Sequence, residues 1–183
     1  MPLKILLFGS PGAGKDTQAD ILSEKLDIFS FSLGQILRDE FASGTDLGRE
    51  VVTYFERGEL VPNEIANSIM RSKLLDPAVQ ARGYIVNGYP RKVSTFQDYI
   101  TFDTPTIAIH LIVSADEAKK RLKHRQRNDD TSNLIEKKIA RYHETEKAVC
   151  EYIQANTKIS YVEINGSLPQ EKVTEMILTH AHQ

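Results

Sequence analysis

Short apolar runs alternate with longer segments of helical periodicity along this chain. The apolar runs at 4–8, 84–86 and 106–113 predict buried strands. The segments at 17–26 and 115–125 place apolar side chains every three or four residues, which is typical of amphipathic helices. Because helices separate the strands, the pattern favours an α/β fold with a parallel sheet covered by helices on both faces.

The remaining periodic segments complete this alternation. Ser114 and Glu117 have the spacing of a capping box, which predicts where the helix at 115–125 begins. Further elements are expected as follows: a helix near 34–41, a helix that Asn63 caps, a long helix from about Leu134, a strand at 160–164 and a last helix at 170–181. Parallel sheets bind ligands beyond the carboxyl ends of their strands, so we expect a site where the strands at 4–8 and 84–86 end.

Composition narrows the class of protein. With 183 residues the chain is long enough for a single domain with a sizeable core. A formal net charge of −2 gives no overall attraction to nucleic acid or to an acidic membrane, so neither partner is expected. The one cysteine, Cys150, suits a reducing compartment, and no apolar run reaches the length of a membrane span or a signal peptide. We therefore expect a cytoplasmic protein.

The stretch "GSPGAGKDTQ" (9–18) carries the clearest chemistry. Its glycines and lysine match the phosphate-binding pattern G-x-x-x-x-G-K, between a predicted strand and a predicted helix. Glycines let successive backbone N–H groups point at phosphate oxygens, and the helix N-terminus adds partial positive charge. The stretch predicts a site for the phosphates of a nucleotide, formed by Gly9, Pro11, Gly12, Ala13, Gly14, Lys15, Asp16 and Thr17.

Cationic residues recur at the predicted strand ends and loop edges. They are Arg38, Arg91, Arg121, Arg125, Arg127, Lys138 and Arg141. A single arginine of this kind is more often a solvated surface residue. Several together suit phosphoryl transfer between two nucleotides, because planar guanidinium groups match the charge that spreads over the oxygens of the moving group.

Five stretches in order resemble the adenylate kinases of the nucleoside monophosphate kinase family. They are "GSPGAGKDTQ", "SLGQILR", "GELVPNE", "NGYPR" and "RLKHRQRNDD", and the resemblance covers nearly the whole chain. It implies a single P-loop domain over 1–183, with a monophosphate-binding helical segment at 31–62 and a short lid at 125–135. A lid this short lacks the insertion that carries zinc in some relatives, so no structural zinc is expected. The resemblance also implies a monomer.

The resemblance assigns roles to individual residues. Lys15 would follow the transferred group, Arg121 would lie against the ATP base, and Arg125 would contact the ATP phosphates. Arg127 would close from the lid, and Lys138 stands where the family usually has arginine. Asp129 and Asp130 match a lid pair that orients these arginines, although a solvated acidic turn explains them nearly as well. The AMP site would comprise Leu33, Gly34, Arg38, Leu60, Val61, Gly88, Arg91 and Thr95, with Gln97 as a further candidate.

At three positions expected to lie near the nucleotide that accepts the phosphoryl group, the chain departs from the adenylate kinase pattern. Leu33 stands where the family usually has threonine, Gln35 replaces an aspartate, and Thr95 replaces the glutamine that reads the adenine edge. Buried hydrogen bonds discriminate strongly between bases, so these changes leave the acceptor open. Gln97 could substitute for the missing glutamine. AMP is the expected acceptor; a kinase for CMP or UMP and a weakly catalytic nucleotide-binding protein are the alternatives.

A fourth departure from the family pattern concerns the residues expected to bind Mg²⁺. Asn87 replaces an aspartate that usually holds the water shell of Mg²⁺, so a charge has been lost. Asp16 directly follows Lys15, where a carboxylate would repel phosphate. Our hypothesis is that Asp16 binds Mg²⁺ from the loop side and offsets Asn87, through water. The alternative is that Asp16 points to solvent in the first turn of the helix.

Overall fold

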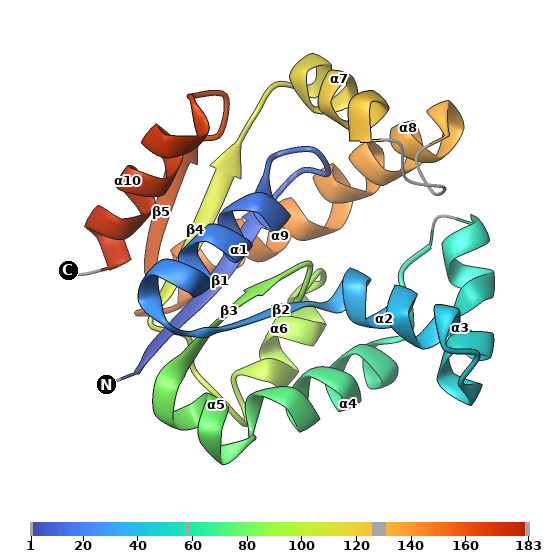
Figure 1. The fold of residues 1–183 in the computed structure, drawn as a ribbon, viewed down its shortest axis with the longest axis horizontal. Coiled ribbons are helices and arrows are strands. Elements are labelled where there is room, and N and C mark those ends of the chain that lie inside the picture. The colour runs from blue at the N-terminus through green and yellow to red at the C-terminus, as the bar shows by residue number, and fades with distance from the viewer. Residues whose placement is uncertain (1, 58, 126–130, 182–183) are drawn as a thin grey trace.

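The computed structural model describes residues 2–57, 59–125 and 131–181. Within this part of the chain the strands form one sheet with the order β2-β3-β1-β4-β5, and every neighbouring pair is parallel (Figure 1). The strands are β1 (Leu3–Gly9), β2 (Phe29–Ser32), β3 (Gly83–Asn87), β4 (Ile107–Ile112) and β5 (Ser160–Asn165). The predicted parallel α/β sheet is confirmed.

Helices connect the strands and cover the sheet (Figure 1). The helices are α1 (Lys15–Leu26), α2 (Leu33–Ala42), α3 (Asp46–Arg57), α4 (Asn63–Leu74), α5 (Pro77–Arg82), α6 (Val93–Tyr99), α7 (Ala115–Arg125), α8 (Ser132–Arg141), the π-helical turn η1 (Tyr142–Glu146), α9 (Lys147–Asn156) and α10 (Gln170–Ala181). In the described part of the chain, no helix has the length and apolar character needed to cross a membrane.

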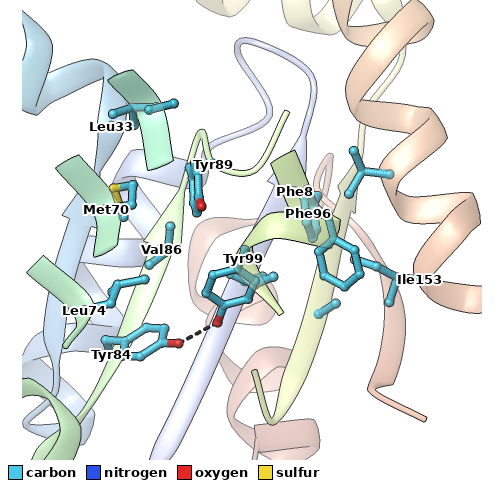
Figure 2. Close-up of a cluster of buried hydrophobic side chains, with 14 of the residues drawn as sticks. Phe8, Leu33, Met70, Leu74, Tyr84, Val86, Tyr89, Phe96, Tyr99 and Ile153 are labelled. Atoms are coloured by element: carbon cyan, nitrogen blue, oxygen red, sulfur yellow. Dashed lines mark hydrogen bonds between the residues drawn. The ribbon is translucent and has the colours of Figure 1, made fainter. Parts of the chain in front are cut away.

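Alternation along β1 divides the core into two clusters. Leu6 and Phe8 face one side of the sheet, where α4, α6 and α9 pack, whereas Ile5 and Leu7 face α1 and α10 on the other side. Such alternation is the period-2 consequence of the pleated strand. Figure 2 shows the first cluster and the hydrogen bond between the hydroxyls of Tyr84 and Tyr99, at 2.5 Å. With both faces covered, the carboxyl ends of the strands remain as the place for a site.

The register of the strands places the segments that follow β1 and β3, where the sequence predicts a site, side by side. Leu7 of β1 lies opposite Asn87, the last residue of β3, so the loop after β1 and the segment after β3 leave the sheet together. On the other side, Gly9 lies opposite Leu111 of β4. The phosphate-binding stretch and the "NGYPR" stretch are therefore neighbours in space.

Element bounds follow the sequence closely, with local corrections. The helices predicted at 115–125 and 170–181 are α7 and α10. The Ser114 hydroxyl accepts the Glu117 N–H at 3.2 Å, which is one of the two hydrogen bonds of a capping box, whereas the Glu117 carboxylate accepts from Arg121. The prediction that Asn63 caps α4 was wrong. Pro62 is the N-cap residue, and the Asn63 amide instead donates to the Ser94 hydroxyl at 2.9 Å.

The long helix expected from about Leu134 is interrupted. Its first and last parts are α8 and α9, and the turn η1 between them is π-helical. A π-helical turn adds one residue to the helical register, and such turns are frequent at functional sites. The side chain of Glu146, the last residue of η1, is thereby set against β1, where its carboxylate meets the Gly9 N–H.

Candidate active site

The loop between β1 and α1 has the geometry of a phosphate cradle. Gly12 and Gly14 have φ angles of 85° and 94°, which residues other than glycine rarely adopt. At Gly12 an added Cβ would lie 2.6 Å from the Ala118 carbonyl oxygen, so α7 also excludes a side chain there. The Lys15 ammonium donates to the carbonyl oxygens of Gly9 and Ser10, at 2.5 and 3.1 Å. Its pKa is lowered, chiefly by burial, so the cation is held largely out of water.

A cavity of about 560 Å³ opens in front of this loop. The loop, α2, α7, α8 and the segments after β2 and β3 all contribute to its wall. The predicted residues that line it are Pro11, Gly12, Gly14, Lys15, Asp16, Thr17, Leu33, Gly34, Arg38, Leu60, Val61, Asn87, Gly88, Arg91, Thr95, Arg121, Arg125 and Lys138. Among the described residues that the sequence proposed, Gly9, Ala13 and Gln97 do not line it. Arg127, Asp129 and Asp130 lie outside the described residues.

Arg38 and Arg91 both line the cavity, and neighbouring groups hold both side chains. The guanidinium of Arg38 donates to the Gln35 side-chain oxygen at 2.7 Å, and the Gln35 amide donates to Asp39 at 2.7 Å. Gln35 therefore links the Arg38 guanidinium to the Asp39 carboxylate along α2. Arg91 donates through Nε to the Gly88 carbonyl oxygen at 2.9 Å.

Two arginines on α7 also line the cavity. Arg121 donates to the Glu117 carboxylate at 2.7 Å and to the Gly166 carbonyl oxygen at 2.9 Å. The Nη1 atom of Arg125 lies 3.9 Å from the Asp16 carboxylate. The spacing of four residues puts both arginines on one helix face, as the sequence predicted.

Arg141 joins the cavity wall beside Lys138; the sequence placed it among the cationic residues that suit phosphoryl transfer but gave it no individual role. Burial and the nearby Arg91 lower the pKa of Arg141 to about 10, while Glu146 and Glu59 act in the opposite direction. At neutral pH the guanidinium remains charged. Its position three residues after Lys138, on the same face of α8, was the signal that could have identified it.

Glu146 is an acidic residue of the cavity wall that sequence reasoning missed. It lines the cavity and is only 4% exposed, although a carboxylate is costly to bury. In the sequence it stands among other charged residues of a helical stretch, so periodicity gave no sign of it. The π-helical register of η1, which the sequence does not reveal, directs it to the base of the phosphate cradle.

Two of the residues that depart from the family pattern, Leu33 and Thr95, belong to the cavity wall. Both are buried, at 6% and 4% exposure. Gln97 is exposed on α6, and its amide donates to the Tyr152 hydroxyl at 3.3 Å. Residues two apart on a helix lie about 200° apart around its axis, so Gln97 points away from the face that Thr95 presents. The structure therefore does not bring Gln97 together with the residues that line the cavity.

Asp16 and Asn87 line the same cavity from the loop and from the end of β3. One carboxylate and one amide oxygen fit Mg²⁺ that is bound mostly by phosphates and water, since this metal keeps several waters in nucleotide sites. In the described part of the chain, no group of three or more His, Cys, Asp and Glu side chains is arranged to hold a metal.

The parallel sheet and the glycine-rich loop place this chain in the class of P-loop proteins. A sequence model of the adenylate kinase family matches residues 7–158. The adenylate kinase of Mycolicibacterium smegmatis is 37% identical over 161 residues, which cover 85% of this chain and 88% of the relative. That of Thermobifida fusca is 32% identical over 186 residues, 97% of each chain. The chain belongs to the adenylate kinase family.

Proposed function

We propose that this chain catalyses the reversible transfer of the γ-phosphoryl group of ATP to AMP, which yields two ADP. The observation that carries the proposal is the single cavity wall on which the phosphate cradle faces Arg38, Arg91, Arg121 and Arg125 from separate elements. Relatives named adenylate kinase at 32–37% identity favour AMP over the other monophosphates. A nucleotide sensor would need only one phosphate site.

The transfer needs positioning and charge stabilisation rather than a covalent intermediate. In this proposal the loop N–H groups and Lys15 hold the β- and γ-phosphates, while Arg38 and Arg91 hold the acceptor phosphate. Arg125 and Arg141 stabilise the charge that develops on the moving group. Guanidinium groups suit this task because their N–H donors match the planar arrangement of the oxygens of the transferred phosphoryl group. The half-buried cavity limits access of water, which would otherwise accept the phosphoryl group.

Mg²⁺ bound to ATP would neutralise charge on the β- and γ-phosphates. Asp16 and Asn87 would hold it through its water shell; what supports this is that both residues line the cavity and carry side-chain oxygens. The cytosol as location and a monomeric state are part of the proposal. The lone buried Cys150 suits a reducing compartment.

A two-headed analogue, two adenosines joined by five phosphates, tests for both nucleotide sites at once. We expect calorimetry to show one molecule bound per chain, with an affinity well above that of ATP. Substitution Arg91→Ala should weaken binding of the analogue but leave binding of ATP nearly unchanged. Equal affinities for ATP and the analogue would refute a second site and would favour a nucleotide-binding protein without efficient transfer.

A further inference from the structure

Glu146 is a buried charge that the transfer reaction described above does not use. Its side chain is held between η1 and the end of β1, on the wall of the cavity. Burial of a carboxylate costs free energy unless cations and hydrogen-bond donors surround it. The groups that contact it therefore indicate what it does.

The carboxylate of Glu146 joins two strand ends. Its Oε1 atom accepts the backbone N–H of Gly9, at 3.2 Å, where β1 enters the phosphate cradle. Its Oε2 atom lies 3.7 Å from Nε of Arg91, in the segment that follows β3. Nε of Arg91 also donates to the Gly88 carbonyl oxygen, so the stem of the guanidinium is fixed from two sides. The remaining nitrogens of Arg91 are the ones available to a phosphate in the cavity.

The cations around Glu146 require a negative charge to offset their mutual repulsion. Lys15, Arg91 and Arg141 share one cavity wall, and like charges in a poorly hydrated site repel one another. Arg91 lowers the pKa of both Lys15 and Arg141, after the larger effect of burial, whereas Glu146 raises both. The carboxylate thus offsets the repulsion among cations that are brought together to bind phosphates.

We propose that Glu146 is a positioning residue for phosphoryl transfer: it ties the Arg91 guanidinium to the base of the phosphate cradle and so sets the acceptor-phosphate site at the correct place relative to the donor. The inference rests on the proposed function. Pre-organised donors stabilise a transition state without reorganising during the reaction, so the loss of this tie should appear in kcat. Glu146 acts through Arg91 and does not itself contact the transferred group.

A double-mutant cycle with Arg91 tests this inference. Glu146→Gln keeps the size of the side chain and an oxygen that can accept the Gly9 N–H, but removes the charge that faces Arg91. We expect kcat to fall about tenfold in the wild-type background and less than about twofold in an Arg91→Ala background, because residues that act as one unit are not additive. Equal factors in the two backgrounds would overturn the proposal and leave Glu146 a structural residue.

Two controls keep the result interpretable. Glu144→Gln removes the same charge from an exposed position in η1 and should leave kcat unchanged. Thermal unfolding of each variant reports any loss of stability. If Glu146→Gln does not fold, Glu146→Asp withdraws the charge by one methylene; it should lower kcat to a smaller extent, and again only while Arg91 is present.

Different results would refute the positioning role of Glu146 and the proposed function. The same cycle is measured by calorimetry with the two-headed analogue, which needs no turnover. Failure of the wild-type protein to transfer phosphate to any monophosphate would refute the proposed function. Additive losses of analogue affinity in the Arg91 and Glu146 variants would refute the positioning role, whatever the turnover.

Discussion

The carboxylate of Asp16, in the first turn of α1, lies 3.9 Å from the Nη1 atom of Arg125, in the last turn of α7. A negative charge beside the phosphate cradle therefore lies near a cation of α7. At this distance the pair is a loose one between half-exposed side chains, and it contributes little to stability. Its relevance is to the site, because both Asp16 and Arg125 line the cavity.

Asp16 should contribute to the binding of magnesium. We expect Asp16→Gly to raise the Mg²⁺ concentration for half-maximal activity about fivefold, which corresponds to about 1 kcal/mol for one solvated charge interaction. Adding Asn87→Asp to this variant should restore the original requirement. Glu24→Gly, farther along α1, is a control for the loss of helix propensity. An unchanged requirement in Asp16→Gly would exclude a magnesium role for this carboxylate.

Leu33 and Thr95 should limit the affinity for AMP. Replacing them as Leu33→Thr and Thr95→Gln restores the two hydrogen-bonding groups usual in the family. At about 1 kcal/mol for each buried hydrogen bond, the double variant should lower the KM for AMP about 10- to 30-fold. Gln97→Ala is the matched control on α6 and should leave the KM unchanged. If Gln97→Ala instead raised the KM, the placement of the acceptor base would be wrong.

Arg141 should stabilise the transferred group. Arg141→Met removes the charge but keeps much of the side-chain length, and we expect kcat/KM to fall about 10²-fold, as for the loss of one donor to a developing anion. Lys137→Met, at an exposed position on α8, is the comparison and should retain activity. Steady-state kinetics with both substrates measures the two effects. Equal activities of the two variants would exclude a role for Arg141 in stabilising the transferred group.

Acid should destabilise the fold through His110. This side chain is buried between the hydroxyls of Tyr161 and Tyr142, at 2.8 and 2.5 Å. Burial lowers its pKa, although Glu163 and Glu146 act in the opposite direction; Lys15 lowers it further. Below the unfolded pKa of about 6.5 the unfolded chain binds a proton that the folded chain excludes, so stability falls with decreasing pH, by at most about 1.4 kcal/mol per unit.

Urea unfolding at pH 7 and pH 5 measures this dependence. The His110→Gln variant should lose less stability than the wild type between the two values. His143→Gln, which changes an exposed histidine of η1, should behave as the wild type does. An identical loss in the wild type and in His110→Gln would assign the acid sensitivity to other groups.

Much of the fold was predictable because its signals are local. The Ser114 capping box fixed the start of α7, and uninterrupted apolar runs identified the strands that are buried on both faces. β2 (Phe29–Ser32) was missed because it is only four residues long, although its alternation of phenylalanine and serine is typical of a strand. The interruption at η1 was also missed, since the π-helical register depends on packing against β1 rather than on any residue type.

The candidate site was predictable as far as residue types indicate phosphate binding. Glycines, Lys15 and arginines at strand ends carry that chemistry in the sequence itself. Glu146 could not be found this way, because its role depends on burial beside Gly9 and Arg91, which are distant in the sequence. For the same reason Gln97 was misplaced: two residues along α6 separate a side chain in the cavity from one on the surface.

The most direct test of the account is phosphoryl transfer by the purified protein, with ATP and Mg²⁺, to AMP, CMP, UMP, GMP and dTMP in parallel. We predict rapid formation of ADP with AMP and much slower transfer to the other four acceptors. Preference for another monophosphate would contradict the account and make Leu33 and Thr95 the determinants of that preference. Binding of ATP with no transfer to any acceptor would contradict it entirely.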